Sequence, residues 1–147
     1  MSTEVMEATV RRLVEEGFNE GNSSVLDAAF DPGYVDHRPH PPPHTEGVAR
    51  VKEAYASYRT AFPDGRLTIE DLVCAGDKAV ARMSFRGTHL GSFAAVPPTN
   101  RPVTMPVVDI WRFAEGRIVE GWHLEDDLGL LQQLDVVPAI ALTPAEL

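Results

Sequence analysis

The apolar positions of the chain follow a helical period before Gly65 and an alternating period after it. The helical period recurs in three stretches, with apolar residues at Met6, Val10, Leu13, Val14 and Phe18, at Val25, Leu26 and Phe30, and at Val48, Val51, Tyr55, Tyr58 and Phe62. Because residues three and four apart share one face of a helix, each stretch predicts an amphipathic helix with one apolar stripe. We expect the third stripe to pack against the concave face of a sheet of at least four strands.

The alternating period predicts that sheet. Four segments read as strands: Leu67 to Ala75, Lys78 to His89, Val103 to Phe113 and Arg117 to Glu125. Glycine-containing turns at 75–78 and 114–117 join them in pairs, which predicts antiparallel hairpins. Asp126 or Asp127 can cap a last short helix. We therefore predict one α+β domain over residues 1–147, a curved antiparallel sheet with three N-terminal helices on its concave face and a pocket between them.

Composition narrows the classes of partner. Of the 147 residues, 44% are apolar and 24% are charged, which is ordinary for one globular domain. The net charge of −9 would repel a phosphate backbone or an anionic membrane, so we expect neither nucleic acid nor membrane as a partner. No apolar stretch approaches the roughly 20 residues that span a bilayer, and the N-terminus lacks the apolar core of a secretory signal. With Cys74 as the single cysteine, we expect no internal disulfide, no Cys-based zinc site and a cytoplasmic location.

Asp109 is the first candidate for chemistry. It lies within a strand that is apolar on both faces, where a carboxylate is costly unless it has a partner. Either the carboxylate reaches the edge of the sheet, or its partner is an arginine, Arg82 or Arg112, or His123 of the next strand. An imidazole held by a carboxylate is a good general base near neutral pH, because the carboxylate fixes the tautomer and favours the protonated form. We therefore predict that His123 is a general acid/base and that Asp109 orients it.

The length of the loop between the two strands decides whether this pair can form. If residues 114–116 form a three-residue loop with Gly116 as a bulge, Asp109 lies opposite Gly121, one diagonal step from His123 on the same face. A two-residue loop would place the two side chains on opposite faces. The glycine at the third position favours the longer loop.

Six short segments resemble the SnoaL-like polyketide cyclases, a branch of the NTF2-like superfamily. In chain order they are Ala61-Phe62-Pro63-Asp64, Gly87-Thr88-His89-Leu90-Gly91, Pro97-Pro98-Thr99, Asp109-Ile110-Trp111-Arg112-Phe113, Gly116-Arg117-Ile118-Val119-Glu120 and Leu128-Gly129-Leu130-Leu131-Gln132-Gln133-Leu134. The resemblance implies a cone-shaped α+β barrel, usually dimeric through the outer sheet face, with no metal and no organic cofactor. It also implies ring closure of an aromatic polyketide by intramolecular aldol chemistry.

The resemblance departs from the family at the catalytic pair. In the cyclases an aspartate follows the tryptophan of a Glu-His-Trp segment, and a histidine stands fourteen positions earlier. Here the segment reads Glu120-Gly121-Trp122-His123, and the earlier position is Asp109, so the two residue types are exchanged.

Further residues are candidates for contact with the substrate. The resemblance implies that His37 and His89 lie near the pocket, the alternative being loop histidines that bond to the backbone. Arg82 is a candidate donor to a developing negative charge, the alternative being an ion pair with Asp71 or Asp109. We also expect three aromatic residues to line or cover the pocket: Tyr55, Phe93 and Trp111.

A histidine-rich segment also raises the question of a metal. His37, His40 and His44 are spaced like a set of metal ligands. Prolines between them prevent a helix from gathering the three side chains on one face. We therefore expect no metal site.

The leading hypothesis is a cofactor-free cyclase that acts on an apolar, polycarbonyl small molecule. The alternatives are an epoxide-opening cyclase, a hydroxylase-like member of the same family, and a non-catalytic ligand-binding or dimerisation module. The module is favoured if Asp109 and His123 point away from the cavity. Epoxide hydrolysis is disfavoured, because Val107 stands where NTF2-like epoxide hydrolases carry an arginine.

Apolar residues on the outer face of the predicted sheet indicate that a second copy of the chain binds there. Val108, Ile110 and Trp122 fall on that face. A monomer would leave them as an unusually large exposed apolar patch. We therefore expect a homodimer through the outer sheet face.

Overall fold

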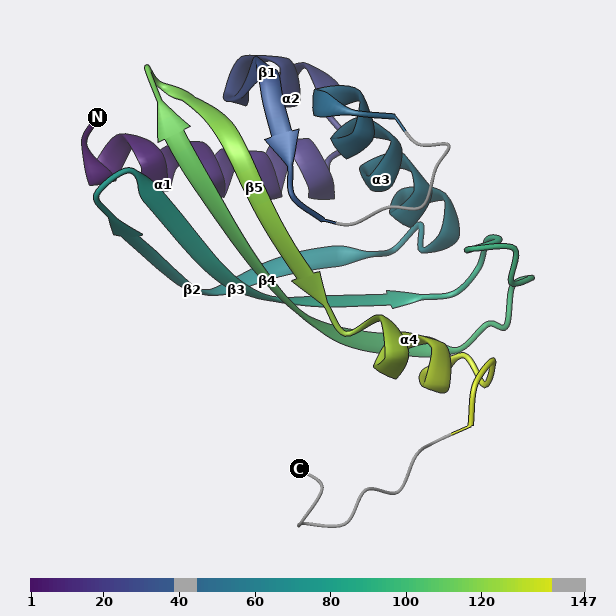
Figure 1. Ribbon diagram of the computed structural model, residues 1–147. Coiled ribbons are helices and arrows are strands. Elements are labelled where there is room, and N and C mark those ends of the chain that lie inside the picture. Colours follow the sequence, from purple (N-terminus) through teal and green to yellow (C-terminus); the bar gives the residue numbers. More distant parts are fainter. Residues whose placement is uncertain (39–44, 139–147) are drawn as a thin grey trace.

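A curved five-stranded sheet, with helices over its inner face, forms the body of the structure (Figure 1). The computed structural model describes residues 1–38 and 45–138. The strands are β1 (Phe30–Asp36), β2 (Arg66–Ala75), β3 (Lys78–Thr88), β4 (Pro102–Ala114) and β5 (Arg117–Glu125). Their order across the sheet is β1-β5-β4-β3-β2, with β1 parallel to β5 and the other neighbours antiparallel. The predicted α+β class and the antiparallel meander are confirmed, and β1 adds a parallel edge strand.

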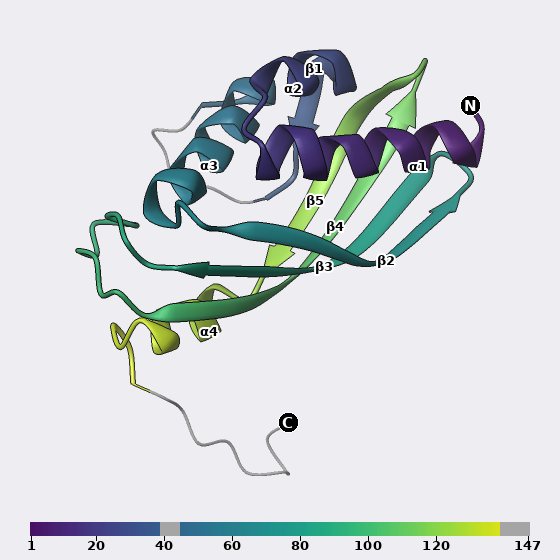
Figure 2. The same cartoon turned by 180° about the vertical axis from the view of Figure 1, so that it is seen from behind.

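The helices are α1 (Thr3–Arg12), η1 (Leu13–Asn19), α2 (Ser23–Ala29), α3 (Gly47–Ala61) and α4 (Asp127–Gln133). Figures 1 and 2 show α1, α2 and α3 on one side of the sheet and α4 beside the start of β4. The prediction of three regular N-terminal helices is slightly wrong, because α1 continues without a break into η1, which is a π-helix. The wider turns of η1 carry four buried residues, and one of them, Phe18, reaches the space between the helices and the sheet.

The apolar stripe of α3 packs on the concave face of the sheet, as predicted. Val51 and Phe62 are buried, and Val48, Tyr55 and Tyr58 are partly buried against the same core. Tyr58 and Phe62 both meet the ring of Phe85 edge-on. The stripe leaves its polar neighbours exposed, which is the pattern that a helix on the surface of a sheet requires.

The start of β1 differs from the prediction. Phe30 begins a strand instead of ending a helix, and Asn22 is the residue that caps α2. The parallel pairing to β5 is irregular between Phe30 and Val35, where Asp31-Pro32-Gly33 lies. Proline has no N–H to donate, so a ladder can accommodate it only at an edge or a bulge.

The β4–β5 hairpin corrects the predicted loop. The turn has two residues, Glu115 and Gly116, both with positive φ, and Ala114 pairs with Arg117. Such a turn alone would place Asp109 and His123 on opposite faces. However, the pairing of β4 with β5 shifts between Arg112 and Phe113, where β5 has one extra residue. This bulge returns the two side chains to the same face, and Asp109 pairs directly with His123. The predicted common face is found, and a bulge is its cause.

The final helix, α4, begins where the sequence predicts. The carboxylate of Asp126 accepts a hydrogen bond from the Gly129 N–H at 2.9 Å, as a helix cap does. Gln133 at its other end exchanges two hydrogen bonds with the backbone of Thr104 and so covers the free edge of β4. Among the described residues, no helix is both long enough and apolar enough to cross a membrane.

Candidate active site

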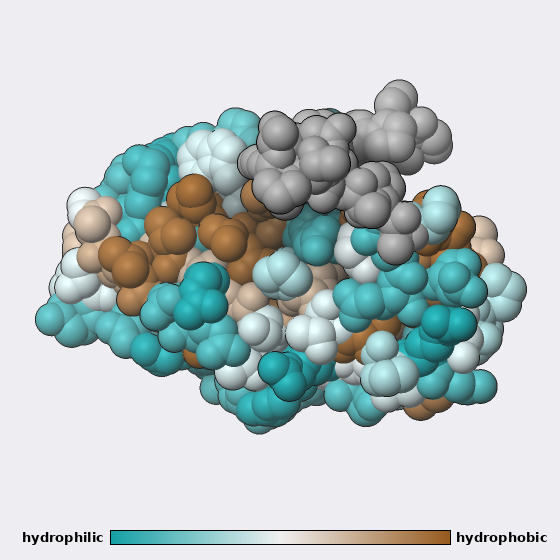
Figure 3. Space-filling view, turned by 90° about the horizontal axis from the view of Figure 1, so that it is seen from below, coloured by the Kyte–Doolittle hydropathy of each residue, from teal (hydrophilic) through white to brown (hydrophobic). Residues whose placement is uncertain are grey.

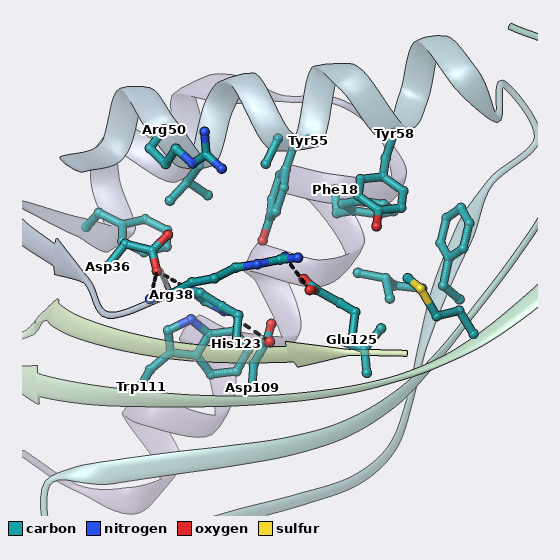
Figure 4. A pocket seen from close by; sticks show the side chains of 17 residues that line it. Phe18, Asp36, Arg38, Arg50, Tyr55, Tyr58, Asp109, Trp111, His123 and Glu125 are labelled. Carbon is teal, nitrogen blue, oxygen red and sulfur yellow. Dashed lines mark hydrogen bonds and ion pairs between the residues drawn. The ribbon is translucent and has the colours of Figure 1, made fainter. Parts of the chain in front are cut away.

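A pocket lies between α3 and the concave face of the sheet (Figure 4). It encloses about 730 Å³ of empty space, its open mouth included. One end is apolar and aromatic, with Phe18, Tyr58, Leu67, Phe85 and Met105 among its walls. The other end is charged, with Asp36, Arg38, Asp109, His123 and Glu125. A site of this size with a few convergent polar groups suits a small, largely apolar molecule.

Asp109 and His123 face each other on the floor of the charged end. Asp109 is 8% exposed, and its Oδ1 lies 3.0 Å from His123 Nδ1. The contact is an ion pair when His123 is protonated, and no other described residue donates a hydrogen bond to the buried Oδ1. Both residues line the pocket, so they do not have the outward orientation that would favour a non-catalytic ligand-binding or dimerisation module.

The pKa of His123 reflects two opposing influences. Burial lowers it, because a buried imidazolium loses its hydration. The adjacent Asp109 carboxylate and the nearby charges of Asp36 and Glu125 raise it. The net effect is a pKa above the ordinary value, so His123 holds its proton to higher pH than a solvated histidine does.

Tyr34 holds the other side of the His123 ring, and sequence reasoning missed it. Its hydroxyl lies 3.0 Å from His123 Nε2, while Asp36 Oδ1 lies 3.8 Å from the same nitrogen. Tyr34 is 3% exposed, and burial raises its pKa well above the ordinary value, so the phenol stays neutral. When the imidazole is neutral and its Nδ1 hydrogen faces Asp109, Nε2 accepts the Tyr34 O–H. The ring is therefore fixed in one tautomer and one orientation.

Gly121 makes this contact sterically feasible. A Cβ at position 121 would lie 2.2 Å from the Tyr34 hydroxyl oxygen and 2.9 Å from His123 Nε2. Neither distance leaves room for a carbon atom. The sequence signal was the glycine itself, which stands in mid-strand, where a close approach of another group is a common reason for it.

Arg38 and Glu125 form a bridge across the charged end, and sequence reasoning missed both. Arg38 follows β1 and extends over the pocket in Figure 4, where its guanidinium pairs with Glu125 of β5. Its second terminal nitrogen donates to Asp127 Oδ2 at 2.7 Å. Burial raises the pKa of Glu125, with Asp109 and Asp127 adding to the effect and Arg38 opposing it. Glu125 could have been found by parity, because it lies two residues after His123 on one strand.

Two predicted residues lie in the pocket wall. Trp111 is buried beside His123, with 6.4 Å between the ring centroids. Tyr55 extends from α3 with its hydroxyl toward the middle of the pocket (Figure 4). Burial raises the pKa of Tyr55 far above the ordinary value, with Asp109 adding to the effect, so its hydroxyl is available as a neutral donor.

Two other predicted residues lie next to the pocket wall without lining the pocket. Phe93 packs on Tyr58 and Phe62, with ring centroids 5.1 and 5.6 Å apart. His89 is fully buried, and its Nδ1 accepts the Thr99 N–H at 3.2 Å. This loop-fixing role matches the alternative in which His89 bonds to the backbone.

The structure places Arg82 and His37 away from the pocket, on the outer face of the sheet. Arg82 pairs with Asp71 at 2.6 Å, and both side chains are more than half exposed. His37 stacks on Trp122 at 4.8 Å between centroids, and its Nε2 lies 2.7 Å from Glu120 Oε2. Alternation explains both positions, since neighbours of inward-facing residues in a strand face outward.

Two of the three histidines considered as metal ligands lie outside the part of the chain that the structure describes. His40 and His44 fall in the segment 39–44, of which the structure gives no description. Within residues 1–38 and 45–138, no group of three or more potential ligands gathers in a way that could hold a metal ion.

Comparisons with known proteins agree with this architecture. TsrD from Streptomyces laurentii superposes with a TM-score of 0.84 at 28% identity, over 93% of this chain and 99% of that one. IdmH, a proposed polyketide cyclase from Streptomyces antibioticus, is 34% identical, with a TM-score of 0.76 over 88% and 98% of the two chains. AclR, a proposed hydroxylase from Streptomyces galilaeus, has a TM-score of 0.80 over 95% and 91%, but at 24% identity it shows the fold alone.

A match to a family profile settles the relationship. No curated protein sequence matches the chain at a significant level. Residues 8–134 match the profile described as SnoaL-like polyketide cyclase, which is most of the chain. The resemblance in the short segments and the NTF2-like architecture are thereby confirmed. The chain belongs to the SnoaL-like polyketide cyclase family.

Proposed function

We propose that the protein closes a ring of an apolar, polycarbonyl small molecule by intramolecular aldol addition. The observation that carries the proposal is the Asp109–His123 ion pair on the floor of a largely apolar pocket. The reaction needs no cofactor for its electron balance, because an aldol addition only redistributes electrons within the substrate. The family and IdmH, a proposed polyketide cyclase, support the same substrate class.

The geometry supports a simple division of roles. A carbon between two carbonyl groups is acidic enough for neutral His123 to remove its proton, and Asp109 stabilises the imidazolium that forms. The enolate carbon then attacks a second carbonyl of the same molecule. The Tyr55 hydroxyl and the Arg38 guanidinium are donors within the pocket that can stabilise the developing oxyanion. The apolar walls hold a flexible chain in one folded arrangement, which lowers the entropy cost of ring closure.

A phenyl-capped linear tetraketone is a suitable test substrate. Aldol addition gives an isomer of equal mass, which then loses water, whereas hydroxylation adds one oxygen. We expect the wild-type protein to accelerate formation of the isomer over buffer. Chromatography with mass detection follows both products. A rate equal to that of buffer, for this tetraketone and for aryl-capped homologues, would reject the cyclase proposal.

Variants test the residue assignment. His123→Ala is expected to lower kcat by about 10²–10⁴-fold, and Asp109→Asn to lower it with little change in KM. The double variant is expected to be scarcely worse than the worse single one, because residues that act as a unit are not additive. Arg82→Ala on the outer face is the matched control and is expected to retain full activity. Full activity of both site variants would contradict the assignment.

We further propose that two copies of the chain associate through the outer face of the sheet. Val108 is 37% exposed and Leu124 is 74% exposed on this face, and the two residues are paired across β4 and β5. Apolar side chains in this position are commonly covered in a complex.

A further inference from the structure

Glu125 lies beside the Asp109–His123 pair on the floor of the same pocket. It pairs with Val107 in the strand ladder, two residue pairs along from the pairing of Asp109 with His123 and on the same face of the sheet. Its side chain is 15% exposed and lines the pocket. A molecule in contact with His123 is therefore within reach of a second carboxyl group from the same strand.

The charges around Glu125 favour a protonated carboxyl group at this end of the pocket. The carboxylates that face this end come from β1, β4, β5 and the start of α4: Asp36, Asp109, Glu125 and Asp127. The cations are Arg38, Arg50 of α3 and, when protonated, His123. Arg38 is shared between Glu125 and Asp127, so one positive charge serves two carboxylates. When His123 is neutral, four carboxylates face two cations, and a proton on one carboxyl group relieves the repulsion.

Of the four carboxyl groups, Glu125 is placed best to hold that proton. Asp127 is half exposed and solvated, Asp36 accepts the backbone N–H of Arg38, and Asp109 lies against His123, whose imidazolium it stabilises. From α3, Tyr55 and Tyr58 face Glu125 with neutral hydroxyls, which add no positive charge to hold it ionised. The raised pKa of Glu125 agrees with this position.

We propose that Glu125 is the acid of the reaction, the group that protonates the carbonyl oxygen attacked by the enolate. The inference deepens the proposed ring closure and rests on it. Glu125 and His123 would then act as a pair that shares one proton. The histidine is the base, and the carboxylic acid of Glu125 is the proton donor.

The step balances within the site. His123 Nε2 takes a proton from the carbon between two carbonyls, and the Tyr34 hydroxyl yields its place on that nitrogen. The C–H electron pair becomes the new C–C bond through the enolate, and the π pair of the attacked carbonyl moves to its oxygen. That oxygen takes the proton of Glu125 and becomes a hydroxyl group. The imidazolium of His123 then returns its proton to Glu125, and the protein regains its starting state with no redox change.

The test compares three carboxylate-to-amide variants on the phenyl-capped tetraketone. Glu125→Gln removes the acid and is expected to lower kcat by about 10²-fold or more, with KM within about threefold of wild type. Glu120→Gln is the matched control, since Glu120 lies on the same strand, faces outward and also pairs with an arginine. It is expected to retain wild-type kcat. Asp127→Asn removes only the second partner of Arg38. Its effect therefore shows whether Glu125 serves only to anchor Arg38 or also acts as the acid.

Several outcomes would overturn the inference. Equal losses of kcat in Glu125→Gln and Asp127→Asn would show that the glutamate only anchors Arg38. A wild-type kcat in Glu125→Gln would show that the acid is elsewhere. The pH profile adds a second criterion: the wild-type profile should be bell-shaped, and Glu125→Gln should leave a single inflection. Glu125→Asp should recover part of the lost rate.

One measurement needs neither turnover nor a folded variant. In wild-type protein with ¹³C-labelled glutamate side chains, the carboxyl resonance of Glu125 should titrate at higher pH than that of an ordinary glutamate, about 4.3. A Glu125 resonance that titrates at or below that value would reject the acid role. Because this result does not depend on the substrate, it separates a failure of this inference from a failure of the proposed cyclase activity.

Discussion

At the scale of single residues, the His123 ring is held from both sides. Asp109 contacts Nδ1 at 3.0 Å, and the Tyr34 hydroxyl lies 3.0 Å from Nε2. A ring fixed in this way loses little further freedom when it meets a substrate, which favours proton transfer in one geometry. Because these contacts set the pKa of His123, a change in either contact should change that pKa.

Asp109→Asn is predicted to lower the pKa of His123. In the wild type, burial lowers this pKa, and the carboxylates of Asp109, Asp36 and Glu125 together outweigh burial and keep the pKa above the ordinary value of about 6.5. Without the Asp109 charge, the pKa falls. Titration of the imidazole resonances by NMR measures the shift, and the acid limb of the pH–rate profile for ring closure should move to lower pH in the variant. An unchanged His123 titration would show that the ion pair does not form in solution.

Gly121→Ala is predicted to lower both activity and stability. The new Cβ would overlap the Tyr34 hydroxyl oxygen, and Tyr34 is too well buried to swing aside freely. We expect a loss of about 2–4 kcal/mol in the free energy of unfolding, measured by urea denaturation, together with a fall in kcat. Combining it with Tyr34→Phe, which removes the overlapping oxygen, should recover part of the stability. Simple additivity of the two losses would contradict the proposed overlap.

At the scale of elements, one tight turn carries strain. Phe93 and Val96 form a bridge around Ala94 and Ala95, whose φ angles are 46° and 64°. A non-glycine residue in the left-handed region costs about 1–2 kcal/mol. Two-residue turns of this kind prefer Asn-Gly.

Replacement of Ala94 by Asn and Ala95 by Gly is therefore predicted to raise the free energy of unfolding by about 1 kcal/mol. Thermal or urea unfolding of the double variant measures the gain. Ala56→Gly, at an exposed site within α3, is the control of opposite sign, with an expected loss of about 1 kcal/mol. A loss of stability in the turn variant would mean that this turn is not strained.

The elements also show how far the sequence determines the site. The stripe of α3 and the four antiparallel strands follow from periodicity, so the fold and the inward position of Trp111 could be predicted. Asp109 and His123 share one face of the sheet because of a bulge in β5, and no periodic pattern in the sequence marks that bulge. The predicted three-residue loop gave the correct face for a different reason. A one-residue change in register moves every later side chain to the opposite face.

The remaining parts of the site depend on contacts between distant segments. Tyr34 meets His123 across 89 residues of sequence, and Arg38 meets Glu125 across 87. Both come from β1 and its end, where proline and glycine interrupt any alternation. Their positions follow from the parallel pairing of β1 with β5, which local patterns do not encode. Arg82 was predicted as a donor from its charge within an apolar strand, and His37 was predicted near the pocket from the family resemblance. Strand alternation places both outside the pocket.

At the scale of the whole molecule, the two faces of the sheet differ in what covers them. The helices and the pocket occupy the concave face. Figure 3 shows apolar side chains gathered on the opposite face, over the strands. Two adjacent rows of the ladder supply them, one with Val73, Val80, Ile110 and Trp122, the other with Val108 and Leu124. The first row joins four strands, so the patch is continuous across the sheet.

The dimer proposal makes the last prediction. At micromolar concentration, the wild-type protein is expected to sediment at twice the 16.1 kDa mass of one chain. Val108→Arg places a charge in the middle of the patch, where it would be buried without a partner, so this variant is expected to sediment as a single chain. Val5→Arg is the control, because Val5 is 51% exposed on α1, away from the outer face. Wild-type protein that sediments only at 16.1 kDa would reject the dimer, and dimers that persist in Val108→Arg would place the interface elsewhere.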